Sequence, residues 1–479
     1  MKLTDLFSNI ADGVRGLFSE KSIIQRAQQA NITELQARQA LWRQVYQNKA
    51  PWLVPGKIYS ANLAAIASGE VARLITLDIR AGIDSSPELN DIFQKEMFWD
   101  IRNQVEYGLA FGGVIIKPYM SAGIPRITFA QSNEYEIIQV DTDGTILDCY
   151  FKDYEQILVD SRYEYLVRVE HHKYNRNTQT YQIINEIYRS DETGMIGTQY
   201  FDVQAQFNRI QRWQGIQVEQ TLTNVKHPLF GFFKPATSNT IDTKSPYGVS
   251  IFDKALQTIM LADRQLSGLV REFKIKEGKL YVDRLALEGT QRASGSLPYL
   301  DDDFYVKMDV DPKQGSTFFE VFSPEIRSEH FLRVFNKYQQ LVEDNIGLMH
   351  GTFSAPDITD RTATEVRESK HKTYSTVSAN QKALQKALQQ AINAVAFYLN
   401  IPTAEVTIIF DDSLLRDPDE VLNSMRDDVS MGLIRPELYL SRKYNISEEE
   451  AREFMPRGTQ LLRGANTLLT WNDTNGMGE

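Results

Sequence analysis

The chain has 479 residues, a length that at roughly 150 residues per domain predicts about three domains and excludes a peptide or a disulfide-stapled module. Apolar residues make up 42% and charged residues 24%, ordinary globular values that exclude a collagen-like or largely disordered chain. The formal net charge of −11 argues against a general nucleic-acid coat. The single cysteine, Cys149, cannot close an intramolecular disulfide, which fits a protein that folds in a reducing cytosol.

The first residues carry an amphipathic pattern. Apolar residues recur at three- and four-residue steps from Leu3 to Phe18, which predicts a short helix. It could dock on a neighbouring subunit or partner, or bind a membrane surface, but its polar face lacks the Lys/Arg richness that membrane binding favours. No secretory signal is expected, and the longest apolar run, near Gly108 to Ile116, is too short to span a bilayer.

The first quarter of the chain is predicted to be mainly helical, and a β-rich insert follows. Helices are expected at 32–47 and 60–77, and Ser86-Pro87-Glu88 should cap a third that reaches about Ala110. Strand patterns then fill an insert at 113–235. Within it, Asp143-Gly144 predicts one hairpin, and Asn175-Arg176-Asn177 joins the strands of a second.

Two long helices are then predicted to bracket a small α/β excursion of about 50 residues. The helices are expected at 250–272 and 324–348, and the strands between them at 279–282 and 304–308. A turn-rich loop, Gly351 to Arg361, opens into a Gly- and Pro-free stretch at 362–400 that predicts one long helix. A strand at 406–410, helices near 418–431 and 447–454, and a polar tail beyond about 459 complete the chain.

The sequence shows no evident active site. The chain has no GxxxxGK[S/T] loop, no GxGxxG after a strand, no HExxH, no GxSxG and no cysteine pair. His171 and His172 are adjacent in a predicted strand, so they should point to opposite faces and cannot share one metal. Asp301-Asp302-Asp303 and Asp411-Asp412 could hold Mg²⁺ if folding brought them together, although solvated loop acids are by far the simpler interpretation. We therefore expect no catalytic residue, no metal site and no cofactor.

Several short motifs, taken in order, resemble one known family. They are Lys57-Ile-Tyr-Ser-Ala-Asn-Leu-Ala-Ala-Ile-Ala-Ser-Gly-Glu-Val-Ala-Arg-Leu, Tyr107-Gly-Leu-Ala-Phe-Gly-Gly-Val-Ile-Ile-Lys, Ser245-Pro-Tyr-Gly-Val-Ser, and the loop into Thr362-Ala-Thr-Glu-Val. Each is weak alone, but their order, over about 400 residues from 30 to 430, resembles the portal proteins of long-tailed bacteriophages of Gram-positive hosts. The two helices that bracket a small excursion are the most discriminating match.

The resemblance implies an α+β portal fold that is mainly helical. Its expected regions are a wing at 1–249, a first stem helix at 250–272, a clip at 273–323, a second stem helix at 324–348, a channel loop at 349–361, a long helix and return strand of the wing at 362–410, and a helical crown with a tail at 411–479. It also implies a homo-oligomeric ring, usually of about twelve subunits, at one vertex of the virion capsid, assembled in the host cytoplasm.

The resemblance further implies a DNA channel and several protein partners. Double-stranded DNA would pass through the ring, and the expected protein partners are the terminase large subunit, a head-tail adaptor protein, and the major capsid and scaffold proteins; no membrane is expected. The channel loop would present Thr352, Phe353, Ser354, Asp357, Thr359, Asp360 and Arg361 to the DNA. At the clip, Lys274, Lys276 and Lys279 could contact DNA or terminase, or be solvated helix-end charges.

The net negative charge suggests how a channel could avoid gripping its cargo. An acidic or neutral lining would let a duplex slide without deep electrostatic wells, with local exceptions at the basic residues. Two other interpretations stay open at this point. One is another head-tail adaptor or minor capsid ring protein, and the other is a metal-dependent nuclease that uses the two aspartate clusters.

Overall fold

The computed structural model describes residues 32–77, 79–121, 123–159, 162–190, 198–276, 279–283, 305–308, 319–322, 327–356, 363–410, 418–444 and 446–454. The chain divides into two compact units, residues 1–411 and 412–479. Helices and several sheets are mixed along the chain, which confirms the predicted α+β class. The predicted helix at 3–18 and both aspartate clusters lie outside the described residues.

The N-terminal helices form largely as predicted, with one difference. The segments are α3 (Ile32–Tyr46), α4 (Leu63–Ile75), α5 (Pro87–Ile92), the π-helix η1 (Phe93–Phe98) and α6 (Ile101–Phe111). The Ser86 side chain caps α5 by accepting a hydrogen bond from the Leu89 N–H. The prediction of one continuous helix to Ala110 was wrong. The i to i+5 spacing of the π-helix stacks Phe93 on Phe98, and α6 starts afresh after Trp99 and Asp100.

The β-rich insert contains two sheets. A five-stranded antiparallel sheet has the order β4-β5-β6-β7-β8, and a three-stranded sheet has the order β3-β2-β9. The strands are β2 (Val114–Ser121), β3 (Ile124–Gln131), β4 (Tyr135–Val140), β5 (Ile146–Val159), β6 (Arg162–Asn175), β7 (Thr180–Ser190), β8 (Glu219–Leu222) and β9 (Gly231–Phe233). Both predicted hairpins, β4–β5 at Asp143-Gly144 and β6–β7 after Asn175, are confirmed.

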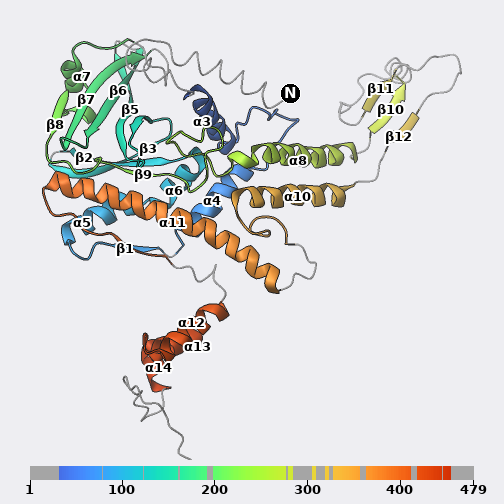
Figure 1. The fold of residues 1–479 in the computed structure, drawn as a ribbon. Coiled ribbons are helices and arrows are strands. Elements are labelled where there is room, and N and C mark those ends of the chain that lie inside the picture. The colour runs from blue at the N-terminus through green and yellow to red at the C-terminus, as the bar shows by residue number, and fades with distance from the viewer. Residues whose placement is uncertain are drawn as a thin grey trace, which may run out of the picture. The chain divides into compact units, whose positions relative to one another are not determined.

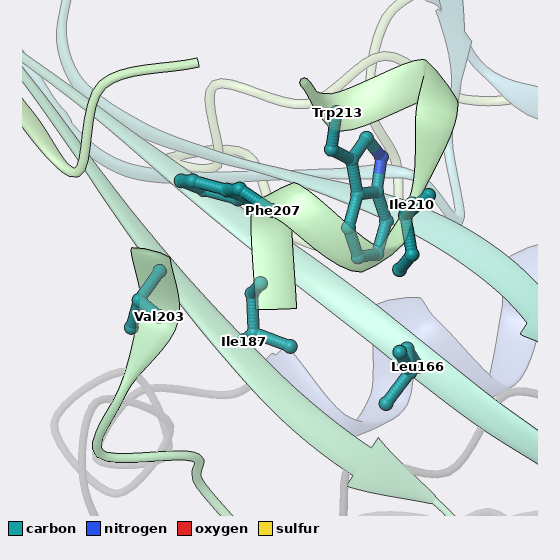
Figure 2. Packing of buried hydrophobic residues seen from close by; sticks show 6 residues of the cluster. All are labelled: Leu166, Ile187, Val203, Phe207, Ile210 and Trp213. Carbon is teal, nitrogen blue, oxygen red and sulfur yellow. The ribbon is translucent and has the colours of Figure 1, made fainter. Parts of the chain in front are cut away.

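One short helical segment inside the insert was not predicted. Helix α7 (Val203–Arg209) and the 3-10 turn η2 (Gln211–Trp213) lie over β6 and β7 (Figure 2). Their side chains form an apolar cluster with the two strands, made of Leu166, Ile187, Val203, Phe207, Ile210 and Trp213. The Trp213 ring is fully buried, and its indole N–H donates to the Asp153 carboxylate at 2.9 Å. Burial of this face gives the five-stranded sheet a core of its own.

The predicted long helix is confirmed as α11 (Ala363–Leu399), which packs against β9 and β2 (Figure 1). The approach is close at Gly231, where a Cβ would lie 1.9 Å from the Ala387 carbonyl oxygen. Only glycine fits there. After α11, the strand β13 (Thr407–Ile409) pairs antiparallel with β1 (Arg80–Gly82), so the end of the first unit returns to its N-terminal part.

The two helices predicted to bracket a small subdomain are both present. They are α8 (Leu256–Lys276), preceded by the 3-10 turn η3 (Asp253–Ala255), and α10 (Ser328–Ile346). Between them, β10 (Lys279–Asp283), β11 (Tyr305–Met308) and β12 (Phe319–Phe322) form a three-stranded sheet of order β11-β10-β12. The first two strands were predicted and β12 was not. No described helix is both long and apolar enough to cross a bilayer.

The described part of the second unit contains three helices, α12 (Pro418–Ser430), α13 (Pro436–Tyr444) and α14 (Glu448–Glu453). Helices α12 and α14 match the predicted pair, and α13 was not predicted. A capping box starts α14, because the Ser447 side chain accepts from the Glu450 N–H while the Glu450 carboxylate accepts from the Ser447 N–H.

Candidate functional site: the stem helices and the turn that follows them

Helices α8 and α10, here called the stem, run antiparallel and lie side by side (Figure 1). Near the distal end, the Arg327 guanidinium pairs with the Glu272 carboxylate. Further along, the Gln265 side chain donates to the Phe331 carbonyl at 3.3 Å. Gly268 permits this contact, since a Cβ there would lie 2.8 Å from the Phe331 ring. The stem is therefore a packed pair of rods.

Two buried carboxylates attach α8 to the N-terminal part of the chain. Asp253 accepts from the Trp42 indole N–H at 2.8 Å and from Arg38 at 3.2 Å. Asp263 accepts from the Trp52 indole N–H at 2.8 Å and from the Ala61 backbone N–H at 2.7 Å. Burial raises the pKa of Asp263, although both hydrogen bonds oppose that shift.

Asp253 also accounts for the later start of the helix. The sequence predicted the helix from Ser250, but the chain makes the tight turn η3 around this carboxylate before α8 begins at Leu256. The two attachments, one in η3 and one in α8, join this end of the stem to the N-terminal part of the chain.

The turn after α10, residues 347–356, is organised around the buried Glu343 carboxylate. Gly347 ends the helix with a positive φ of 81°, a conformation that favours glycine. The carboxylate of Glu343 then accepts from the backbone N–H groups of Phe353 at 2.7 Å, Ser354 at 2.9 Å and Gly351 at 3.2 Å, and from the Ser354 hydroxyl at 2.7 Å. One carboxylate thus satisfies four donors of the turn.

The same turn folds back along α10. The Asn336 side chain accepts from the Ala355 N–H at 2.7 Å and donates to its carbonyl at 3.2 Å. The Gln339 side chain donates to the Phe353 carbonyl at 3.3 Å. The chain therefore returns beside helix positions that lie roughly two to three turns before the end of α10. The sequence did not indicate this reversal.

This geometry bears on the predicted channel-loop residues. Ser354 is buried, and Thr352 and Phe353 are half-buried. This first part of the predicted channel loop, residues 351–356, is fastened to α10. The other four predicted residues, Asp357, Thr359, Asp360 and Arg361, lie outside the described residues. Contact of any of the seven with DNA stays a prediction.

A second set of contacts joins the turn to the start of α11. The Thr373 hydroxyl accepts from the Met349 N–H at 2.8 Å, and the Thr376 hydroxyl donates to the Gly347 carbonyl at 3.0 Å. Asp344 pairs with Lys372 at 3.0 Å and with His350 at 2.9 Å. Partial burial would raise the pKa of Asp344, but its hydrogen bonds with His350 and Lys372 outweigh this effect and hold the pKa below its ordinary value.

The exposed charges of the stem are mostly positive, in a chain whose net charge is negative. Six exposed cations of this region form no ion pair with a described residue, and they are Lys254, Arg264, Arg271, Lys274, Arg333 and Lys337. Arg264 and Arg271 are seven residues apart on α8 and so share one face, with Lys274 close to it. The expectation of an acidic or neutral channel lining stays a prediction.

Of the three predicted clip lysines, Lys274 is exposed, and the side chains of Lys276 and Lys279 lie outside the described residues. Arg264 and Arg271 were not among the predicted site residues. Their heptad spacing was the signal that could have identified a basic row.

The described residues offer no metal site, since they contain no cluster of three or more His, Cys, Asp or Glu side chains suited to one. His171 and His172 point to opposite faces of β6, as predicted. His171 contacts the Asp148 carboxylate at 2.6 Å, whereas His172 lies buried between Tyr181 and Glu170, each at 2.8 Å. Cys149 is fully buried, and burial raises the pKa of its thiol well above the ordinary value, so it is an unreactive core residue.

An antiparallel helix pair around a small sheet, followed by a fastened turn and a 37-residue helix, is the plan of a portal protein rather than that of a short adaptor. A family model described as "Phage portal protein, SPP1 Gp6-like" matches residues 70–455. The match spans most of the chain, so the chain belongs to this family. The predicted family is confirmed, and the Gram-positive host stays a prediction. None of the curated proteins matches the chain.

Proposed function

We propose that copies of this phage portal protein close into a ring at one vertex of the capsid, and that duplex DNA enters and leaves through the central hole. The observation that carries the proposal is the stem, two antiparallel helices that are fixed to the wing by Asp253 and Asp263 and that lead into the Glu343-centred turn. Rigid rods of this kind suit lateral packing of identical copies around an axis.

We also propose that the basic row of α8 faces the DNA. Duplex DNA carries one negative charge per roughly 1.7 Å, and each Lys or Arg that neutralises a phosphate adds salt-dependent attraction. A few exposed cations per copy, Arg264, Arg271 and Lys274, give weak contacts that repeat around the ring. The surrounding chain, with its net charge of −11, limits how firmly the duplex is held.

The proposed partners follow from the same arrangement. A packaging terminase would dock at the clip sheet β11-β10-β12, and a head-tail adaptor would later occupy the same end of the ring. Capsid and scaffold proteins would surround the wing, with assembly in the host cytoplasm. In this proposal the chain neither cleaves nor forms any bond of the DNA and acts only as a conduit.

The first experiment tests the ring. Purified full-length protein is examined by negative-stain microscopy and sedimentation velocity at two concentrations, and is incubated with plasmid DNA and Mg²⁺. We expect rings with a central hole and intact DNA. A chain that stays monomeric under all assembly conditions would refute the ring, and Mg²⁺-dependent cleavage would support the nuclease interpretation instead.

The second experiment tests the basic row. The double variant Arg271→Glu/Lys274→Glu is expected to assemble normally but to lower the yield or length of packaged DNA at least several-fold, because four units of charge change per copy. Arg102→Glu, a change at an exposed arginine of α6, is the matched control and should package normally. Normal packaging by the double variant would remove the row from the DNA path. Arg361→Glu tests the channel loop in the same assay.

A further inference from the structure

The contacts between the two stem helices define two sides of the pair. Helix α8 contacts α10 through Gln265 and Glu272, and α10 contacts α8 through Phe331 and Arg327. One step along a helix turns the side chain by about 100°. Because the helices run antiparallel (Figure 1), positions one residue before a contact residue lie on the same side of the pair in both helices. Positions one residue after a contact residue lie on the opposite side.

One side, here called the basic side, carries exposed residues that are all basic in type, and they are Arg264, Arg271, His330, Arg333 and Lys337. The first three precede Gln265, Glu272 and Phe331 by one residue. The last two lie six residues after Arg327 and Phe331, a rotation of about 600°, which falls 120° short of two full turns. Both helices therefore contribute to the basic side.

The opposite side of the stem is apolar. It carries Leu266, Phe273 and Leu332, which follow the contact residues by one. Phe273 is 50% exposed and Leu332 is 52% exposed. The stem is therefore amphipathic, with its cations gathered on one side.

Acidic side chains do not balance the basic side within the stem residues 253–274 and 327–346. The exposed Glu329 lies two residues before Phe331, which places it on the side of α10 that faces away from α8. The other acidic side chains of these ranges are already engaged in buried hydrogen bonds or in ion pairs, and they are Asp253, Asp263, Glu272, Glu343 and Asp344.

The basic side therefore holds like charges next to one another on a packed surface. Gln265 lies beside Phe331, so Arg264 and Arg333 stand at about the same height on the two helices. From Lys337 to Arg271 the cations extend over about 18 Å along the stem. One strand of a duplex presents a phosphate every 3.4 Å or so along its axis, so about five successive phosphates fit this length. A polyanion of regular spacing is the partner that complements such a surface.

We propose that the basic side of the stem faces the channel axis, so that α10 as well as α8 contacts phosphates of the duplex. This inference rests on the proposed ring and deepens the proposed contact of α8. It assigns Arg333 and Lys337 to DNA binding, and it turns Phe273 and Leu332 away from the duplex. The reverse orientation would set apolar side chains against a charged cargo and leave the guanidinium groups without phosphates.

Crosslinking from chosen positions tests which side faces the DNA. Cys149 is buried and unreactive, so a cysteine introduced at the surface can be labelled selectively with a photoactivatable crosslinker. The full-length variants are assembled into DNA-filled capsids and irradiated, and they are Arg264→Cys, Arg333→Cys, Phe273→Cys and Leu332→Cys. We expect crosslinks to DNA from positions 264 and 333 to exceed those from 273 and 332 by about tenfold or more.

Each other outcome of the crosslinking experiment has a definite meaning. Crosslinks to DNA from position 264 but not 333 would confine the contact to α8 and overturn the inference, while the proposed function stands. Stronger crosslinks from 273 and 332, or none from any of the four positions, would overturn it as well. Crosslinks from 264 and 333 to protein instead of DNA would identify an acidic protein as the occupant and would also overturn it. If the wild-type chain forms no ring, the proposed function itself fails.

Charge changes on α10 supply an independent readout. Arg333→Glu should form rings and lower the amount of packaged DNA roughly twofold or more, as Arg264→Glu does, because each changes two units of charge per copy. Arg333→Lys keeps the charge and should package as wild type. Glu329→Lys, a charge change of equal size on the side of α10 that faces away from α8, is the matched control and should leave packaging unchanged. Normal packaging by Arg333→Glu, or an equal change from Glu329→Lys, would remove α10 from the DNA path.

Discussion

The Glu343 carboxylate offers a sharp test of how the turn after the stem is held. We consider the variant Glu343→Gln, which keeps the shape of the side chain and removes its charge. The amide oxygen can keep the two shorter backbone bonds, from the Phe353 and Ser354 N–H groups. The new amide NH₂ then faces the Gly351 N–H, a donor opposite a donor. The Ser354 hydroxyl can rotate and accept instead.

The size of the effect follows from this count. Two neutral bonds replace two charge-assisted ones, and one backbone donor loses its acceptor. A hydrogen bond to a charged group is worth about 1.5–3 kcal/mol, and a neutral one about 1 kcal/mol. The half-buried Gly351 donor can still reach water in part, so we expect the turn to lose about 2–3 kcal/mol of stability against local opening. That corresponds to a roughly thirty- to 160-fold larger equilibrium constant for local opening of the turn.

Native-state hydrogen exchange of the Phe353 and Ser354 amides measures this directly. The neighbouring residue supplies the matched control, since Asp344→Asn is the same chemical change at an exposed position whose ion pairs are worth at most about 1 kcal/mol. We expect Glu343→Gln to accelerate exchange of both amides far more than Asp344→Asn does. Equal acceleration by the two variants, or none from Glu343→Gln, would refute the role assigned to this carboxylate.

Three further predictions concern packing and ionisation. Gly231→Ala should lower the free energy of unfolding by about 3 kcal/mol or more, because its Cβ would overlap the Ala387 carbonyl, whereas Gly69→Ala in α4 should be neutral or slightly stabilising; denaturant melts distinguish them. Burial lowers the pKa of His172, so the unfolded chain takes up that proton first. Stability should therefore fall as pH drops below about 6.5, and His172→Gln should flatten that slope in a pH series of melts. Asp143 should titrate with a pKa of about 2, held down by the Thr145 side chain and backbone N–H and by Arg176, and Thr145→Val should move it upward in an NMR titration. The hydrogen bonds that the Asp143 carboxylate makes in the turn therefore stabilise the fold fully above about pH 3.8. Their contribution is lost as the pH falls through about 2.

Local patterns predicted those elements that local interactions decide. Asp143-Gly144 specifies a tight turn through its own backbone preferences, and Gly144 indeed has a φ of 79°. The helix at 363–399 follows from a long stretch without Gly or Pro. The strand β12 and the helix α13 escaped notice because short elements with weak periodicity are stabilised by their partners. The π-helix at Phe93–Phe98 preserves apolar burial by a change of helical period, which no simple pattern records.

The candidate site was predictable in outline and not in mechanism. Two helices around a small excursion could be read from periodicity, because each helix shows its apolar stripe in the sequence. The role of Glu343 could not be predicted from the sequence. An acidic residue in the stretch Glu-Asp-Asn near a helix end has the pattern of a side chain exposed to solvent. Its four donors lie eight to eleven residues later and meet it only after the chain reverses. Satisfaction of buried polar groups is a property of the folded turn.

The turn is held from two sides, and this constrains how it can move. Its bonds to Asn336, Gln339 and Glu343 fix it to α10, and its bonds to Thr373 and Thr376 fix it to α11. Helix α11 in turn packs against the wing at Gly231, where no Cβ separates the backbone of Gly231 from that of Ala387. A displacement of residues 347–356 relative to α10 must therefore break the Glu343 bonds or carry the start of α11 with it. Because a packed helix transmits strain along its length, such a motion would also load the contact at Ala387. A force applied to this turn would then reach β9 through α11 as well as the N-terminal part of the chain through the stem.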